Sequence, residues 1–270
     1  MLIDTHCHLD ASEFAKDRAA VIERSGEKGV GGIVIPSVAR FNFDTVRELA
    51  HSFKGGSYAL GIHPLFVPDA LEPDLAELDF QIQRSLDDPR FVAIGEIGLD
   101  YFIPGLKTPE MREKQETYYS AQLDLAQRYG LPVLLHVRRS QDILLKHLRR
   151  RPRIGGIAHA FNGSFQQAEQ FIEMGFALGF GGAMTFSRAL QIRRLAAQVP
   201  VEALVLETDA PDIPPAWLGQ PGQAGPRNEP GEVAAIAQVM AELRNASLDD
   251  IILASAANAR RVLPRLAGAA

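Results

Sequence analysis

The chain has little of several features that define other classes of protein. It contains a single cysteine, Cys7, in 270 residues, so no disulfide can form within the chain. No apolar run approaches the roughly 18 residues that a transmembrane helix needs. The sequence also enters an apparent strand at once, without a signal peptide. Together these absences predict a cytoplasmic protein that does not insert into a membrane.

A strong charge of either sign is also missing. The formal net charge is −5 and the isoelectric point is about 5.8, which argues against a protein that coats nucleic acid with a basic surface. Any contact with nucleic acid should therefore be local. No linker rich in Ser and Gly divides the chain, so residues 1–270 are expected to form one domain. The stretch 211–231, dense in Pro and Gly, is expected to be a functional loop inside that domain.

Short apolar runs alternate with amphipathic segments along the whole chain. Runs of 4 to 8 apolar residues suit strands that are buried on both faces. Strands are expected at residues 2–8, 30–36, 57–63, 91–97, 131–137, 154–160, 175–181 and 203–209. Helices are expected near residues 14–27, 45–53, 75–87, 109–129, 140–150, 232–245 and 248–261. The chain thus reads as eight strand and helix pairs.

Eight units of this regularity favour an α/β fold of the TIM-like (β/α)8 barrel type. An open, doubly wound sheet would gather its ligand-binding residues at one switch point in the strand order. In a barrel, by contrast, active residues come from many strands around a ring, at the C-terminal ends of those strands. The candidate site residues of this chain follow the second pattern.

Six potential metal ligands lie at or near the C-terminal ends of the expected strands. They are His6, His8, Glu96, His136, His159 and Asp209. Because strand side chains alternate, His6 and His8 should point the same way and Cys7 the opposite way. A single buried histidine is more often an ordinary core residue, but five of the seven histidines fall at expected strand ends. Mixed imidazole and carboxylate ligands fit Zn, Mn or Ni better than Ca, with Mg also possible.

Seven short segments contain the candidate ligands and their neighbours: residues 3–8, 61–64, 95–101, 136–138, 159–161, 207–211 and 227–230. In residue types and order, these segments resemble those of the TatD-type metal-dependent hydrolases and deoxyribonucleases of the amidohydrolase superfamily. The resemblance implies two divalent metal ions, with these ligands: His6, His8 and Asp209 for one, His136 and His159 for the other, and Glu96 bridging them. Relatives that cleave amides often carry a carbamylated lysine at the bridging position. Ala160 departs from the Cys or Gly of many relatives, but strand alternation turns it away from the metals.

Residues beside the ligands suit phosphate chemistry. Arg138 lies two residues beyond His136, and its planar guanidinium can hold two phosphate oxygens, although a structural ion pair is the alternative. His63 is expected either to donate to a phosphate or to orient a ligand. Asp100 and Tyr101 are expected to fix the tautomers of the imidazoles.

Two further groups of polar residues are expected to be structural. Glu207 shares a face with Asp209 but lies deeper along the strand, which favours a structural hydrogen bond over metal ligation. Four arginines between residues 149 and 153 end a helix and precede a strand. That position is on the barrel face opposite the metals, where cations complement the helix dipole.

These placements predict a metal-dependent phosphodiesterase, specifically a deoxyribonuclease that trims DNA ends. An acidic protein with a recessed barrel mouth would accept a strand end more readily than it would grip a duplex. Two cations would supply hydroxide from bound water near neutral pH, with Asp209 as acid/base and Glu96 as the bridge. No membrane and no obligate protein partner are implied. The alternatives are hydrolysis of another ester or amide, such as an aminoacyl ester on tRNA, and a non-catalytic metal-binding protein.

Overall fold

The computed structural model describes residues 1–219 and 227–269 and confirms the expected parallel barrel. Its strands are β1 (Leu2–Asp4), β2 (Val30–Pro36), β3 (Gly56–Leu60), β4 (Phe91–Asp100), β5 (Val133–Arg138), β6 (Gly156–Ala158), β7 (Phe176–Phe180) and β8 (Leu204–Leu206). Each strand pairs in parallel with the next one along the chain, in the order β1 to β8. The loop expected at 211–231 is described except for residues 220–226.

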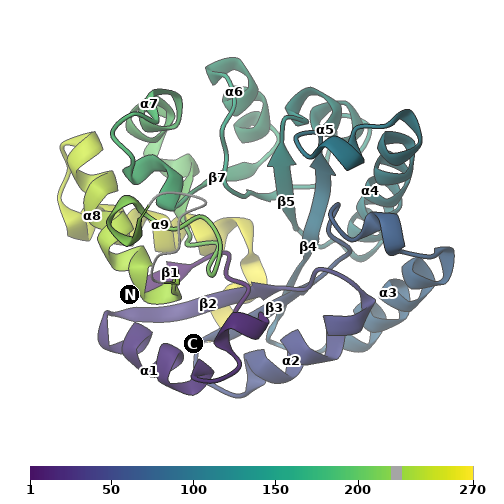
Figure 1. Cartoon of the computed structure of the whole chain (residues 1–270), viewed down its shortest axis with the longest axis horizontal. Coiled ribbons are helices and arrows are strands. Elements are labelled where there is room, and N and C mark those ends of the chain that lie inside the picture. The colour runs from purple at the N-terminus through teal and green to yellow at the C-terminus, as the bar shows by residue number, and fades with distance from the viewer. Residues whose placement is uncertain (220–226, 270) are drawn as a thin grey trace.

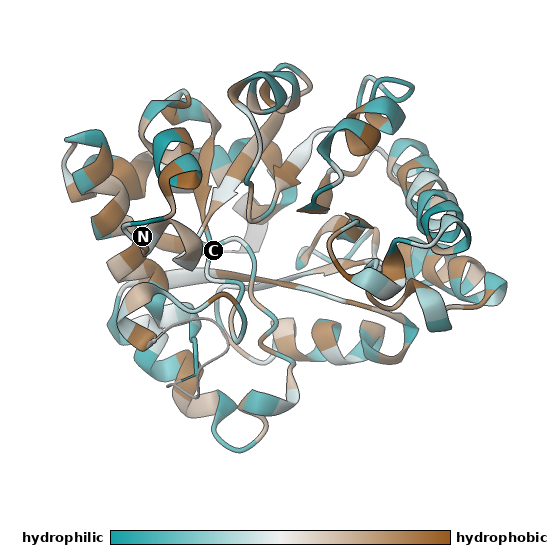
Figure 2. Ribbon diagram, turned by 45° about the horizontal axis from the view of Figure 1, so that its top comes forward, coloured by the Kyte–Doolittle hydropathy of each residue, from teal (hydrophilic) through white to brown (hydrophobic). Residues whose placement is uncertain are grey.

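The helices follow the strands in chain order and lie outside them (Figure 1). They are α1 (Arg18–Glu27), α2 (Phe43–His51), α3 (Glu72–Ser85), α4 (Pro109–Tyr129), α5 (Gln141–Leu148), α6 (Phe165–Glu173), α7 (Leu190–Gln198), α8 (Val233–Arg244) and α9 (Leu248–Val262). Apolar and polar residues alternate along these helices (Figure 2), as expected for helices that pack one side against the barrel. None of the helices in the described part of the chain has both the length and the apolar character needed to cross a membrane.

Helix α4 shows how local sequence sets the ends of an element. The hydroxyl of Thr108 accepts a hydrogen bond from the backbone NH of Met111, and Pro109 occupies the first turn, where its missing NH costs nothing. Gly130 ends the helix in the left-handed conformation, with φ of 63°, which glycine adopts without steric cost. The chain then turns directly into β5, which carries His136.

Backbone hydrogen bonds between the ends of β8 and β1 close the barrel. They run from Thr5 N to Leu206 O (3.1 Å), from Asp209 N to His6 O (2.9 Å) and from His8 N to Ala210 O (2.8 Å). Cys7 and Ala210 also form an isolated parallel bridge. The closure therefore fixes the segment that holds both N-terminal histidines against the segment that holds Asp209.

Four strands end before the site residues that they were expected to carry. Strands β1, β3, β6 and β8 end at Asp4, Leu60, Ala158 and Leu206. The cause at β6 and β8 is a residue in the left-handed region just beyond the strand, Ala160 (φ 44°) and Asp209 (φ 55°). Such a conformation is incompatible with a strand, so the backbone turns at these points. His6, His8, His159 and Asp209 therefore lie in loops at the C-terminal mouth of the barrel.

An apolar cluster fills the barrel interior and continues into α9. Its members from the strands are Ile3, Val34, Ala59, Val92, Ala93, Leu134, Ile157, Ala177 and Val205, and those from the C-terminal segment are Ala256, Ala259, Val262, Leu263 and Leu266. Asn258 on α9 donates to the carbonyl oxygens of Val201 and Leu204, at the start of β8. Helix α9 therefore plugs the N-terminal end of the barrel, and the C-terminal end is left for the site.

The packing of α9 against the barrel interior predicts that substitutions at two of its alanines have different effects on stability. Ala259 is fully buried in the interior cluster, whereas Ala257 on the same helix is exposed. Ala259→Leu should lower the free energy of unfolding by about 1–3 kcal/mol, because added methyl groups overpack a filled core. Ala257→Leu should change it by less than about 0.5 kcal/mol. Urea unfolding of both variants would test this, and equal effects would show that α9 is not part of the barrel core.

Candidate metal site

The six expected ligands converge at the C-terminal mouth, together with His63. The structure contains three overlapping groups whose donor atoms lie within 4.8 Å of one another: His6 with His8 and Asp209, His6 with Glu96 and His159, and His63 with Glu96 and His136. Glu96 belongs to two of these groups. His136 and His159, which the sequence assigned to one ion, each meet Glu96 but do not share a group within the described residues.

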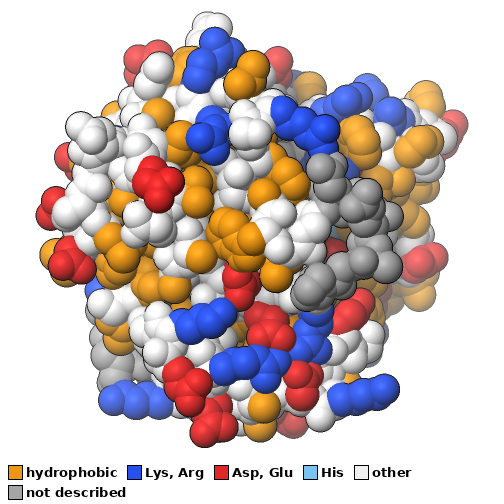
Figure 3. Space-filling view, turned by 60° about the vertical axis from the view of Figure 1, so that its left-hand side comes forward, with side chains coloured by type: hydrophobic (Ala, Val, Ile, Leu, Met, Phe, Trp, Pro, Cys, Tyr) orange, Lys and Arg blue, Asp and Glu red, His pale blue; other side chains and the backbone are white. Residues whose placement is uncertain are grey.

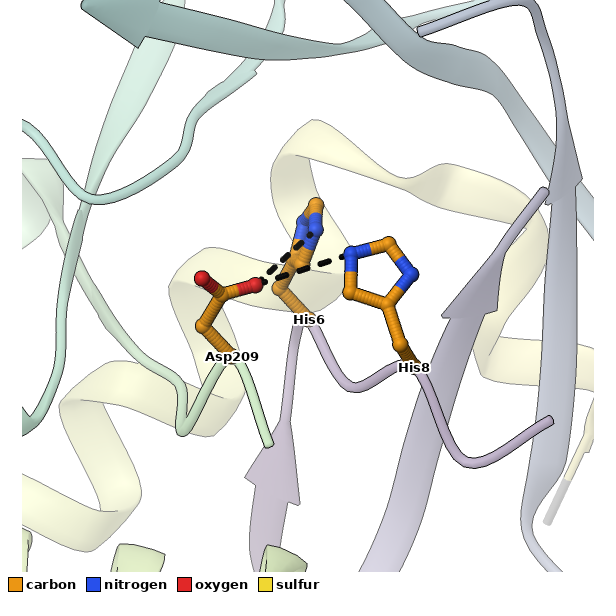
Figure 4. Close-up of side chains that lie close together, drawn as sticks. All are labelled: His6, His8 and Asp209. Carbon is orange, nitrogen blue, oxygen red and sulfur yellow. Dashed lines mark ion pairs between the residues drawn. The ribbon is translucent and has the colours of Figure 1, made fainter. Parts of the chain in front are cut away.

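The first part of the site combines residues from the segments that close the barrel (Figure 4). Asp209 Oδ1 lies 3.6 Å from His6 Nε2 and 3.6 Å from His8 Nε2. Glu96 Oε2 approaches the same two nitrogens at 3.0 and 3.3 Å. These four side chains therefore point their donor atoms at one common volume. His8 and Asp209 retain some exposure, so this volume is open to the mouth.

The second part of the site surrounds the other oxygen of Glu96. Its Oε1 lies 2.9 Å from His136 Nδ1, 3.2 Å from His63 Nε2 and 3.7 Å from His159 Nε2. The carboxylate is itself almost fully buried. The two oxygens of Glu96 thus face two different sets of imidazoles, which is the geometry that a bridging carboxylate requires.

Strand β4 must bend locally to deliver Glu96 into this position. The pairing register of β4 with β5 shifts between Ile94 and Ile97, on either side of Glu96. Irregularities of this kind commonly re-aim a side chain next to an active site. Gly95 has φ of 145°, and a Cβ there would lie 2.6 Å from the carbonyl oxygen of Leu134. Only glycine allows β4 and β5 to pack this closely beside the site.

Carboxylates fix the orientation of two imidazoles from behind. Asp100 Oδ2 lies 3.1 Å from His136 Nε2, so the Nδ1 atom of that ring is turned toward Glu96. Glu207 Oε1 lies 3.1 Å from His159 Nδ1 and also accepts from the backbone NH of Ala160 at 2.6 Å. Each imidazole therefore presents one defined nitrogen to the centre of the site.

The expectation for Tyr101 is wrong. Its hydroxyl donates to Glu116 Oε1 on α4 at 3.1 Å, and Arg112 packs over its ring at 4.6 Å. Because β4 extends to Asp100, alternation turns the next side chain away from the barrel interior. Tyr101 therefore joins β4 to α4 and does not orient an imidazole.

Arginines occupy both ends of the barrel, in different roles. Arg138 ends β5 at the mouth, with 47% of its side chain exposed and Nη1 at 3.7 Å from Asp100 Oδ2. In the run 149–153, Arg151 is buried and binds Asp124 and Ser120 on α4. That run begins where α5 ends, on the side away from the metal site, so its one buried member is structural.

A buried hydrogen-bond network that the sequence did not predict lies behind the first part of the site. Asp4 is fully buried, and its Oδ1 accepts from the backbone NH groups of His6 (3.2 Å) and Thr208 (3.0 Å). Asn228, also fully buried, donates from Nδ2 to Thr208 O at 2.9 Å and to Asp212 O at 2.7 Å. The segments that carry His6 and Asp209 are thus tied together on both sides. The signal for both residues was their place in the matching segments, Asp4 in residues 3–8 and Asn228 in residues 227–230.

Burial and charge set the protonation of the cluster. Burial lowers the pKa of His6 to about 3 and that of His63 to about 4, so both imidazoles are neutral and able to bind a metal. For His159, burial is outweighed by Glu207 and Asp209, which raise its pKa to about 10. Burial raises the pKa of Asp209 to about 6. A divalent cation would take the place of the protons, such as that on His159, whose positive charge balances Glu207 and Asp209.

Comparisons with known proteins agree with this geometry. A family model described as TatD related DNase matches residues 3–264. The metal-dependent hydrolase YjjV of Escherichia coli K12 is 40% identical over 252 residues, which cover 92% of each chain. The 3′-5′ ssDNA/RNA exonuclease TatD of Klebsiella pneumoniae is 32% identical over 248 residues, which cover 90% of each. The crystal structure of YjjV matches with a TM-score of 0.88 at 39% identity, covering 97% of this chain and 98% of that one. The chain belongs to the TatD family and is a metal-dependent hydrolase.

Proposed function

We propose that this hydrolase is a phosphodiesterase that removes nucleotides from the end of a nucleic acid strand, with DNA as the expected substrate. The observation that carries the proposal is the placement of Glu96 between two sets of imidazoles, one of which includes His136, whose partner Asp100 also lies 3.7 Å from an exposed arginine at the barrel mouth. The exonuclease activity in the name of the Klebsiella relative supports it. The cytoplasmic location and the absence of an obligate protein partner stay predictions of the sequence.

The donor set fits two divalent cations. We assign His6, His8 and Asp209 to one ion, His136 and His159 to the other, and Glu96 to both. The mixture of imidazole and carboxylate favours Zn, Mn or Ni, and Mg is also possible. His6 Nε2 faces the other donors, at 3.0 Å from Glu96 Oε2. His6 Nδ1 is buried without a hydrogen-bond partner in the described structure. When bound, such ions lower the pKa of a coordinated water and neutralise charge on a phosphoryl oxygen.

Asp209 is the residue we assign to the proton transfer. It lies at the mouth on a backbone in the left-handed region, a strained conformation of the kind that clusters at functional sites. Its Oδ1 faces His6 and His8, while its Oδ2 lies 3.9 Å from His159 and is the atom placed to take a proton from the attacking water. Glu96 is too deeply buried to reach a substrate, so its part in catalysis is to hold the two halves of the site in register.

Arg138 and His63 are the residues we assign to the substrate phosphate. Arg138 is exposed at the mouth, two residues beyond His136 on β5, where its guanidinium can hold two phosphate oxygens. His63 is less accessible, and its Nε2 lies 3.0 Å from His136 Nδ1 as well as close to Glu96. Of the two, Arg138 is therefore the group that meets the phosphate first, and His63 supports the ligands beneath it.

The overall charge of the protein does not favour strong attraction of a polyanion. On the face drawn in Figure 3, side chains of Lys and Arg are interspersed with those of Asp and Glu. The net charge of −5 points the same way. Affinity for nucleic acid must then come from a few cations at the mouth, which suits recognition of a strand end.

Metal content tests the bridging assignment. Glu96→Ala should lose more metal than His159→Ala, because Glu96 would contact both ions and His159 only one. Elemental analysis after dialysis would measure the metal bound per chain. The thermal unfolding of both variants in excess chelator gives the matched control for folding. A Glu96→Ala protein with full metal content would contradict the bridge.

Substitution of Asp209 separates chemistry from metal binding. Asp209→Asn keeps the size and one donor oxygen but removes the carboxylate base, so activity should fall by at least about 10²-fold. The variant should retain more metal than Glu96→Ala. Steady-state rates at matched metal loading would measure the effect. Turnover near that of the wild type would rule out Asp209 as the base.

The phosphate assignment predicts a graded loss at Arg138. Arg138→Lys should reduce kcat/KM on phosphodiesters because lysine lacks the two-pronged head, and Arg138→Ala should reduce it more, by about ten- to a hundredfold for a contact worth on the order of 1.5–3 kcal/mol. With neutral carboxyl esters as substrates, both Arg138 variants should lose much less kcat/KM. Arg150→Ala, at the far end of the barrel, is the control and should change neither. Equal losses on both substrate types would instead favour hydrolysis of another ester or amide.

A further inference from the structure

Two arginines contact one exposed phenylalanine at the rim of the metal site. Phe102 lies just beyond β4 and is 40% exposed. The Cζ atom of Arg138 lies 4.1 Å from the centre of its ring, and that of Arg139 lies 4.8 Å from it. The two positive charges are therefore no more than about 9 Å apart, which is comparable to the Debye length of about 8 Å at physiological salt. The ring attracts both cations without neutralising either.

Asp100 ties this group to the catalytic site. Its Oδ1 accepts from the backbone NH groups of Phe102 at 2.8 Å and Ile103 at 3.1 Å, which fixes the turn that presents the ring. Its Oδ2 lies 3.1 Å from His136 and 3.7 Å from Arg138. One buried carboxylate thus serves an imidazole and one arginine at the same time. Positive charge remains in excess on the rim.

Arg139 carries most of that excess. Its side chain is exposed, and no carboxylate pairs with it among the residues that the structure describes. Its φ of 55° places it in the left-handed region, which is uncommon for arginine and disfavoured by roughly 1–3 kcal/mol. A strained backbone that holds an unpaired cation beside the active site is more readily explained by ligand binding than by folding stability.

We infer that Phe102, Arg138 and Arg139 form a two-cation platform that binds two successive phosphates of a single strand. This inference rests on the proposed function. Arg138, beside His136, meets the phosphate at the metals, and Arg139 meets the next phosphate along the strand. Phe102 is a positioning residue that keeps both guanidinium groups on the rim. The platform makes the enzyme prefer an oligonucleotide to a substrate that has only one phosphodiester.

The first test removes the charge of Arg139 without disturbing its backbone. Asparagine tolerates the left-handed conformation, so Arg139→Asn should fold normally. On a short single-stranded DNA at low salt, its kcat/KM should fall by about tenfold or more, mainly through KM. The slope of log(kcat/KM) against log salt should become shallower by about 0.7. Bis(4-nitrophenyl) phosphate, which has one phosphodiester, should be cleaved as by the wild type, and Arg150→Asn should behave as the wild type on both.

A change in the substrate identifies the phosphate that Arg139 binds. An oligonucleotide with a neutral methylphosphonate at the penultimate linkage of both ends should be cleaved less well by the wild type. The same replacement should hardly lower the kcat/KM of Arg139→Asn. The methylphosphonate and the substitution remove the same interaction, so their effects should not add. Phe102→Leu should show a smaller loss of the same kind. Additive losses in kcat/KM from the methylphosphonate and the substitution would overturn the platform. So would an Arg139→Asn protein of lower thermal stability whose log(kcat/KM) depends on salt as that of the wild type does.

Failure of the platform can be distinguished from failure of the proposed function. If the wild type cleaves both the DNA and the small phosphodiester while Arg139→Asn matches it, the platform is wrong and the phosphodiesterase stands. If the metal-loaded wild type cleaves neither substrate, the proposed function is wrong. Fluorescence anisotropy with a labelled single strand then tests the platform by itself, since Arg139→Asn should still bind more weakly than Arg150→Asn. Equal binding would reject the platform as well.

Discussion

The carboxylate of Glu96 is the group on which the arrangement of the site depends. Its two oxygens meet imidazoles from five histidines, while only about 1% of the side chain is exposed. A buried carboxylate is costly unless cations or hydrogen bonds compensate it. The surrounding imidazoles together supply that compensation: their charges and the hydrogen bond with His136 outweigh the effect of burial and hold the pKa of Glu96 well below its usual range. The same crowding of donors makes the site favourable for a divalent cation, and metal binding should stabilise the fold.

Such a site requires a scaffold that fixes loops as firmly as strands. Most of the ligands lie just past the ends of short strands, and the closing bonds between β8 and β1 hold their loops together. Asp4 and Asn228 add buried hydrogen bonds to the same segments. The described residues include five with positive φ that are not glycine, and four of these lie in loops at the C-terminal mouth: Arg139, Ala160, Asp209 and Ile213. Strain is concentrated where the chemistry takes place, and the filled barrel with its α9 plug supports it.

The sequence was sufficient for the barrel because the relevant signals are repetitive. Eight apolar runs separated by amphipathic segments leave few alternative folds, and the ligands were found by their position at the ends of those runs. The strand ends were less accurate, because nothing in the residue types marks Ala160 or Asp209 as left-handed. Tyr101 was misplaced because β4 continues to Asp100 and alternation then decides its direction. His63 has the residue type of a ligand, but only the fold shows that it touches Glu96.

The two ends of the barrel have different roles: the N-terminal end contributes packing, and the C-terminal end carries the site. At the N-terminal end, α9 fills the interior, and Arg151 is buried in hydrogen bonds within its own domain. At the C-terminal end, Arg138 and Arg139 remain exposed, and the aromatic ring that holds them cannot neutralise them. On a chain of net charge −5, the exposed pair Arg138 and Arg139, with Asp100 as the one carboxylate close to Arg138, creates a local attraction for phosphate. Under the proposed function, these two cations would favour binding of a nucleic acid strand at the mouth, next to the metal site.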